Sequence, residues 1–352
     1  MPLVTDEHPP AAAAATATDA SLRGALRSLR VLFGDGALVA AGSGPPLERM
    51  AMRSDPPSVA PCVPLEAPGA RQIAVPSEPL VAAFLDGVQR SRVVGYLAGS
   101  PLIYASVAAA VRERVARRLE TWRAPSVRRA LFVSRGKLGE TAWNQLVESG
   151  VPMVDITADV ADEAIPVHPF ALRARALDLV ALEREGLERR LAAEWCRSES
   201  RWLWIDGGIS GNLAVDERAT AFGVVKSHTT LYGSAEQVES VLTLREAERS
   251  PAFLVGHRPR RAVASWYLRL RTTAGGDPMH GLVRVEISPP MDMLDPDHIT
   301  DDARARLTEH CDRLSAGILA ERAPLSLPDP RWDTLTYGIH ACEMYLDALV
   351  GI

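Results

Sequence analysis

The order of apolar and polar positions places the start of the regular core near residue 80. Leu80–Asp86 is a short apolar run that ends in Asp-Gly, which is typical of a buried strand leaving the core. Ser91–Ala98 and Leu102–Ala108 follow after short turns that contain Gly, Pro or Ser. Because a parallel crossover needs about a dozen linking residues, three strands this close together are expected to form an antiparallel meander.

Strand and helix patterns alternate after the meander. Ala109–Trp122 is the first segment after the meander with helical periodicity and is expected to form a helix. We then expect strands at 129–134, 151–156, 201–206, 221–226, 262–271 and 282–287, and helices at 140–149, 170–196, 301–322 and 335–350. A meander followed by alternating strands and helices predicts an α/β fold: a mixed sheet, antiparallel meander plus parallel strands, flanked by helices.

The N-terminal part differs in composition from this core. Residues 1–20 contain the run Ala11–Ala15 and are predicted to be a disordered tail. Residues 21–79 are expected to form an irregular extension, with a short amphipathic helix over Ser21–Leu32 and a connection rich in Pro, Gly and Ser over 43–79. A single regular domain is expected over 80–352.

Composition narrows the function classes. The chain is 47% hydrophobic and 24% charged, as in ordinary globular proteins, and its net charge is -5. A nucleic-acid ligand would therefore need local arginine patches or a partner protein. The sequence has no secretory signal pattern and no apolar run of 18 residues, so a cytoplasmic protein without a membrane span is expected.

Two strands that end in Asp-Gly carry the main candidate chemistry, at Asp86-Gly87 and Asp206-Gly207. Asp-Gly is by itself a common turn dipeptide. A carboxylate at the end of a buried strand, however, needs a cation or hydrogen bonds to neutralise it. Two such aspartates on neighbouring strands predict a site for Mg²⁺ or Mn²⁺. Asp155, which no glycine follows, is a weaker competitor.

A third acidic ligand is expected from the helix at 170–196. Glu183 falls on the same face as the apolar stripe of this helix and is the first choice, because a carboxylate on a buried face requires a partner. Glu185 and Glu188 remain open as alternatives.

Basic residues suggest where a phosphate would lie. Of the 39 basic residues only Lys137 and Lys226 are lysines, and a lysine that persists in such an arginine-rich chain is a candidate for a task that needs a compact ammonium group. Lys226 ends a strand shortly after Asp206 and is expected to contact a phosphate. DNA-binding candidates also include Arg258, Arg260 and Arg261. Lys137 is interpreted as a tolerant surface position.

These residues, in this order, resemble the NurA family of nucleases. The matching segments are FLDGVQRS (84–91), WLWIDGGIS (202–210), GVVKSH (223–228), Arg284-Val285-Glu286 and His340. Two departures are Val88, where the family has serine, and Trp332-Asp333, where the family has Tyr-Pro; Tyr337 is the alternative polar aromatic residue.

The resemblance implies an RNase H-like core and a two-metal-ion deoxyribonuclease. Its catalytic residues would be Asp86, Asp206, a helix glutamate such as Glu183, Lys226 and His340. It further implies Mn²⁺ (or Mg²⁺), 5′-to-3′ exonuclease and single-strand endonuclease activity, a homodimer, and a HerA-type hexameric translocase as partner. DNA end repair and defence against phage DNA are both compatible with such an enzyme.

Two other function classes remain open. A degenerate RNase H-like adaptor would bind DNA or the translocase without cleaving. A phosphotransferase of the actin–hexokinase type also uses Asp-Gly turns near phosphate, but it would need a late Gly-rich adenosine-binding segment, and the sequence offers none. A P-loop is also lacking, which argues against ATP hydrolysis of that type.

Overall fold

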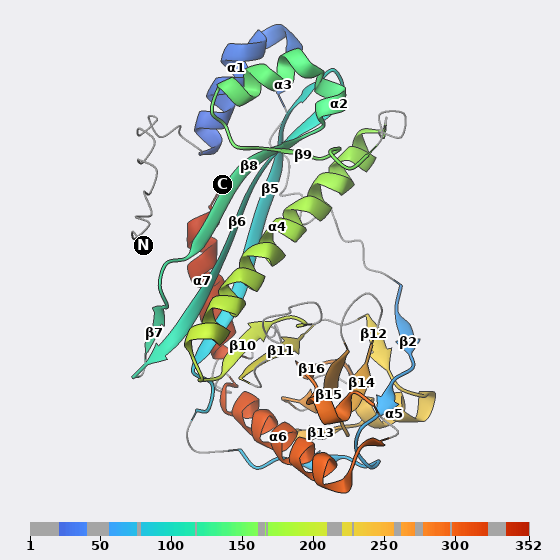
Figure 1. The fold of residues 1–352 in the computed structure, drawn as a ribbon. Helices are drawn as coiled ribbons and strands as arrows, with labels where there is room; N and C mark the ends of the chain where they lie inside the picture. Colours follow the sequence, from blue (N-terminus) through green and yellow to red (C-terminus); the bar gives the residue numbers. More distant parts are fainter. Residues whose placement is uncertain are drawn as a thin grey trace, which may run out of the picture.

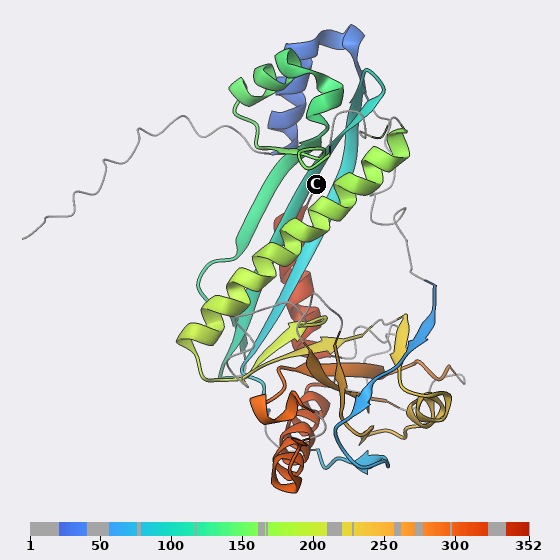
Figure 2. The ribbon, with the colours of Figure 1, turned by 45° about the vertical axis from the view of Figure 1, so that its right-hand side comes forward.

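The structure is a computed structural model. It describes residues 21–40, 56–75, 79–116, 118–160, 166, 168–209, 220–226, 229–256, 262–271, 277–295, 298–322 and 336–351. Within these residues, fourteen strands form one mixed sheet with the central order β3-β14-β15-β16-β11-β10-β5-β6-β8-β9, and β12 and β2 form a second, two-stranded sheet. The molecule is elongated, with a long hairpin joining two ends that carry helices (Figures 1 and 2).

The elements have the following bounds. The helices are α1 (Leu22–Ala37), α2 (Arg135–Leu138), α3 (Glu140–Glu148), α4 (Pro169–Ser198), α5 (Ala235–Leu242), α6 (Asp301–Ala320) and α7 (Tyr337–Val350), with the 3-10 helix η3 (Met291–Met293). The strands of the first half are β1 (Leu38–Ala40), β2 (Ser58–Ala60), β3 (Val63–Pro64), β4 (Arg71–Gln72), β5 (Ala83–Leu97), β6 (Ser100–Val115), β7 (Arg118–Thr121), β8 (Ser126–Val133) and β9 (Met153–Asp155). Those of the second half are β10 (Leu203–Asp206), β11 (Ala221–Val225), β12 (Thr230–Tyr232), β13 (Glu248–Arg249), β14 (Phe253–Val255), β15 (Val263–Arg269) and β16 (Leu282–Ile287).

The central strands confirm the expected mixed α/β architecture. β5, β6 and β8 form an antiparallel meander. β10 pairs in parallel with β5 on the other side, and β11 pairs in parallel with β10. The order β8-β6-β5-β10-β11, with α4 connecting the meander to β10, is the arrangement expected of an RNase H-like core flanked by helices.

The meander is built differently from the expectation. The predicted strands Leu80–Asp86 and Ser91–Ala98 are one continuous strand, β5, which passes through Asp86-Gly87 without turning. Its pairing with β6 is unbroken from Ala83 to Val93. Ladder hydrogen bonds from this long antiparallel partner override the local turn preference of Asp-Gly.

The helix predicted over Ala109–Trp122 is wrong. These residues form the second half of β6 and the short strand β7. Alanine favours helices, but β6 lies between helices on both faces of the sheet. Ala105 and Ala109 belong to the core on the α4 side, whereas Ala108 and Ala110 pack with Cys342 of α7 and its apolar neighbours. The alanines therefore act as small spacers under two closely packed helices.

Helices α4 and α7 cover opposite faces of the β5–β6 hairpin (Figures 1 and 2). α4 buries an apolar stripe that includes Val180, Leu187 and Leu191. α7 approaches so closely that a Cβ on Gly338 would lie 2.3 Å from the Phe84 ring. Both helices thus pass directly over the middle of the sheet.

The extension before residue 80 is more regular than expected where the structure describes it. β3 and β4 pair with β14 and β13, adding strands to the edge of the large sheet. Fully buried Arg249 anchors this segment: its Nη1 lies 2.7 Å from Glu66 Oε2, and its Nε lies 2.6 Å from Asp312 Oδ1 on α6. A buried charge needs such partners, so the extension is part of the folded unit.

Three further expectations concern the N-terminal tail, the domain boundary and membrane spans. The tail at 1–20 lies outside the described residues. The division at residue 79 into an extension and one nuclease domain stays a prediction. Among the described helices, none has the length and apolar character needed to cross a membrane.

Two glycine-to-alanine substitutions test the packing of the two helices. Gly338→Ala is expected to lower the free energy of unfolding by about 1–3 kcal/mol, because the added methyl group must displace the Phe84 ring or the helix. Gly186→Ala in α4 is the matched control, because the nearest atom to an added Cβ is Arg190 Nη1 at 3.9 Å. It should stabilise by about 0.5–1 kcal/mol. Urea denaturation measures both, and equal effects of the two substitutions would contradict the packing described.

Candidate metal centre

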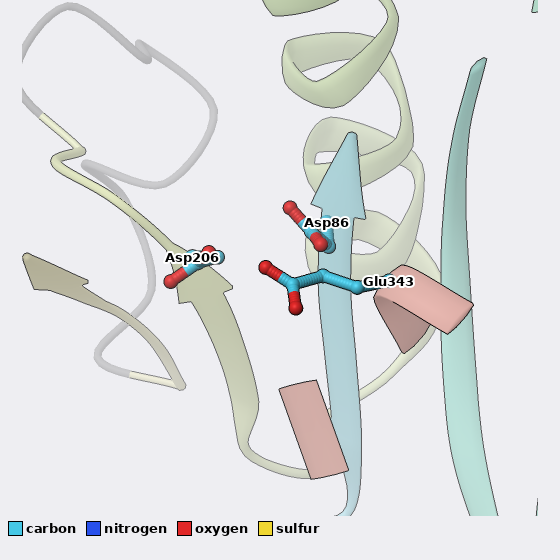
Figure 3. A group of neighbouring side chains, drawn as sticks. All are labelled: Asp86, Asp206 and Glu343. Carbon is cyan, nitrogen blue, oxygen red and sulfur yellow. The ribbon is translucent and has the colours of Figure 1, made fainter. Parts of the chain in front are cut away.

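Three carboxylates from three elements meet on the α7 side of the central sheet. Asp86 of β5, Asp206 of β10 and Glu343 of α7 each offer an oxygen, and these oxygens lie within 4.8 Å of one another. Figure 3 shows the three side chains pointing toward one another above β5 and β10. Residues 86, 206 and 343 are far apart in the sequence, so only the completed sheet and the last helix assemble the group.

The parallel pairing of β5 and β10 sets the two aspartates side by side. Leu85 is opposite Ile205, so the next residues on both strands are Asp86 and Asp206. β10 ends at Asp206, and the chain turns away through Gly207, whose φ of 100° favours glycine. The prediction of a strand end is therefore confirmed for Asp206 and wrong for Asp86, which lies inside β5 where its parallel neighbour stops.

The Glu188 side chain of α4 occupies the space that a side chain at position 87 would need, so only glycine fits after Asp86. A Cβ at Gly87 would lie 2.1 Å from Glu188 Oε1. The glycine therefore lets a carboxylate from α4 approach the backbone beside Asp86. The Asp-Gly pair on β5 reflects this close approach and not a turn.

Burial gives Asp86 and Glu188 unusual protonation behaviour. Asp86 is 6% exposed; its Oδ1 accepts the Gly87 N–H at 2.7 Å, and its Oδ2 has no hydrogen-bond partner among the described residues. Burial, with the neighbouring charges of Asp206 and Glu343, holds the pKa of Asp86 well above its ordinary value. Burial also raises the pKa of Glu188 to about 7, although the Arg184 guanidinium opposes the shift. A cation placed here would relieve this cost.

Lys226 and His340 lie next to the three carboxylates. Lys226 Nζ is 2.8 Å from Asp206 Oδ2 and 3.8 Å from Glu343 Oε1. His340 is one turn before Glu343 on α7, with its Nδ1 3.6 Å from Glu343 Oε2. Both residues were candidates from the sequence, and the structure brings both to the group.

The Arg284-Val285-Glu286 run supports the turn that follows Asp206. Glu286 Oε2 accepts the Ile209 N–H at 2.9 Å, and Glu286 Oε1 lies 2.7 Å from Arg284 Nη2. This buried pair on β16 fixes the backbone two to three residues after Asp206. The run is therefore a positioning element and does not reach the carboxylate group.

The expectation for Glu183 does not fit this geometry. Its carboxylate pairs with Arg128 of β8 at 2.5 Å, and Glu343 instead completes the group with Asp86 and Asp206. α4 crosses the hairpin obliquely, so Glu183 faces β8, whereas Glu188, more than one turn later, faces Gly87 on β5 (Figure 1). A helical wheel cannot show which strand lies under each turn.

The competitor Asp155 is satisfied locally. Its Oδ1 accepts hydrogen bonds from the Arg135 N–H and from the backbone and hydroxyl of Thr157. It closes the turn after β9 and lies apart from Asp86.

Glu343 is the site residue that sequence reasoning missed. It is the first charged residue in the apolar helix YGIHACEMYLDALV, and its side chain is 35% exposed. A carboxylate within a largely apolar helix, one turn after His340, is the signal that could have pointed to it. The signal is weak, because only the contact of α7 with β5 brings Glu343 to the aspartates.

Other candidates cannot be placed. Arg258, Arg260, Arg261, His228 and Trp332 lie outside the described residues. Tyr337, the alternative aromatic residue, begins α7 and is largely exposed.

The donor set fits a hard divalent cation. The three groups that offer ligand atoms to one another are carboxylates, with Lys226 and His340 beside them, and Mg²⁺ and Mn²⁺ prefer oxygen ligands. Asp86 belongs to this group, and its buried Oδ2 lacks a hydrogen-bond partner in the described chain. The residues therefore suit one ion between Asp86, Asp206 and Glu343, and Glu188 offers a further carboxylate beside Asp86.

Comparison with known proteins gives no assignment: the chain matches no protein-family model and no curated protein.

The raised pKa of Glu188 predicts a pH-dependent stability in metal-free buffer. The pKa of Glu188 is 4.5 in the unfolded chain and about 7 in the folded chain, so the folded state binds the proton more tightly. The resulting stabilisation is fully present below pH 4.5 and is lost as the pH rises through 7. Glutamine does not ionise, so Glu188→Gln should not lose this stabilisation. The free energy of unfolding of the variant minus that of the parent should therefore be about 2 kcal/mol higher at pH 8 than at pH 4.5. Urea unfolding in EDTA measures this difference.

Glu183→Gln is the matched control for that measurement, because it lies on the same helix and pairs at the surface with Arg128. An equal pH response of the two variants would contradict the assigned burial of Glu188.

Proposed function

We propose that this chain is a metal-dependent nuclease that hydrolyses DNA phosphodiester bonds. One observation carries the proposal: the carboxylates of Asp86, Asp206 and Glu343 converge within 4.8 Å, and one buried oxygen of Asp86 has no hydrogen-bond partner in the described chain. Such a cluster is costly, and the single positive charge of Lys226 offsets only part of its negative charge. Carboxylate-held divalent ions on an RNase H-like sheet suit phosphoryl chemistry.

Each residue near the group then has a task in the proposed reaction. A bound Mn²⁺ or Mg²⁺ supplies Lewis-acid stabilisation of the phosphate and an activated water. Asp86, Asp206 and Glu343 would hold the ion, and Glu188 would be a candidate ligand for a second one. Lys226 binds a phosphate oxygen through its ammonium group. His340, whose Nδ1 has no hydrogen-bond partner in the described chain, transfers a proton at the leaving or attacking oxygen.

We further propose that the nuclease is of the NurA type. Support comes from the segments on which the resemblance rests: Asp86, Asp206, Lys226 and His340 lie together, and Glu286 holds the turn after Asp206. The proposal includes digestion from 5′ ends, single-strand endonuclease activity, a homodimer, and a HerA-type translocase that delivers DNA to the acidic chain. DNA labelled at the 5′ or the 3′ end distinguishes the polarity.

The central test removes each carboxylate charge in turn. Asp86→Asn and Asp206→Asn are expected to lower Mn²⁺-dependent DNA cleavage by at least about a thousandfold, and Glu343→Gln and Glu188→Gln by about tenfold to a hundredfold, because each loses a charge that holds a metal ion. Cleavage of a labelled single strand, measured with and without EDTA, gives these rates.

Glu183→Gln is the control for this series, since Glu183 carries the same charge on α4 and pairs with Arg128. It should retain parental activity. Full activity in Asp86→Asn or Asp206→Asn would overturn the proposal. A parent protein that binds DNA or a translocase but shows no cleavage dependent on Asp86 would instead favour the adaptor function.

A further inference from the structure

Lys226 occupies an unusual place for a residue that is expected to bind substrate. Its ammonium group is 2.8 Å from Asp206 Oδ2 and 3.8 Å from Glu343 Oε1, and its side chain is only 12% exposed. Two of the three carboxylates of the candidate metal centre are therefore already neutralised in part by a charge from the same chain. The ammonium group of Lys226 is thus a cation that the chain itself supplies to the site.

We propose that Lys226 is a built-in counter-ion that competes with the divalent metal for Asp206 and Glu343, and so sets the affinity with which the centre binds metal. The inference rests on the proposed metal centre but adds a property to it. Metal binding then exchanges one cation for another: the ammonium group leaves Asp206 and becomes free to meet a phosphate.

The competition follows from charge and space. A divalent ion held by the Asp206 carboxylate lies about 2.1 Å from an oxygen, and Lys226 already uses that carboxylate. Two cations on one buried carboxylate repel strongly, since a site of this burial screens charge poorly. Asp206, Glu343 and Asp86 are the acidic groups that act on the ammonium.

Lysine suits this exchange better than arginine would. A guanidinium group is planar and forms two fixed hydrogen bonds to a carboxylate, whereas an ammonium group is compact and sits on a flexible four-carbon chain. It can rotate away from Asp206 without breaking a bidentate pair. The chain has 37 arginines and only two lysines, and one of the two is at this position.

The test measures Mn²⁺ binding to the whole chain by isothermal titration calorimetry, without DNA. Lys226→Gln keeps an N–H donor for Asp206 but removes the charge, and Lys226→Met removes both. Both variants are expected to bind Mn²⁺ at least tenfold more tightly than the parent. The matched control is Lys137→Gln, the other lysine, on α2, which should bind like the parent.

A second measurement covers the case in which a variant folds poorly in the absence of metal. Thermal unfolding of the same proteins in EDTA and at increasing Mn²⁺ should show a larger Mn²⁺-induced stabilisation for the Lys226 variants than for the parent, by linkage. If the parent binds Mn²⁺ and both Lys226 variants bind it equally or more weakly, this inference is overturned but the proposed metal centre is not. Failure of the parent and all variants to bind Mn²⁺ would overturn the metal centre itself.

Discussion

The close packing of α4 and α7 on the two faces of one hairpin is the constraint on which the site depends. Alanines of β6 keep both helices near the sheet, and Gly338 brings α7 into contact with the Phe84 ring. The same closeness removes water from the residues of β5 between the helices. Asp86 is therefore buried as a consequence of packing, and its carboxylate must be neutralised by groups that the two helices and their neighbours supply.

The helices and strands bring several carboxylates and one ammonium group to this buried region. α4 brings Glu188 over Gly87, and α7 brings Glu343 toward Asp86 and Asp206. Lys226, at the end of β11, brings the ammonium group that balances part of this charge. Burial, together with the neighbouring negative charges, raises the pKa values of Asp86 and Glu188, so without a metal ion proton binding relieves this charge. Protons, lysine and metal thus act as alternative neutralising partners for one set of carboxylates.

The sequence predicted the parts of this arrangement that depend on local pattern. The strand that ends at Asp206 and the helices near 170–196 and 335–350 lie where apolar periodicity placed them. The predictions failed where a distant partner overrides local preference: Asp86-Gly87 continues a strand because β6 pairs with it, and Ala109 and Ala110 continue a strand because helices cover both faces. Neither partner can be read from nearby residues.

The same distinction explains the errors in the ligand set. A carboxylate on the apolar face of a helix is a reasonable candidate for burial, and both Glu183 and Glu188 lie near the sheet. Which of them reaches Gly87, the residue after Asp86, depends on the angle at which α4 crosses β8, β6 and β5, and this angle is set by packing along the whole helix. Glu343 depends likewise on how α7 lies on β5. The identity of the buried aspartates follows from strand pattern, but the charges that surround them follow from the way two helices cross the sheet. A metal centre of this kind is therefore specified more by helix packing than by any single sequence motif.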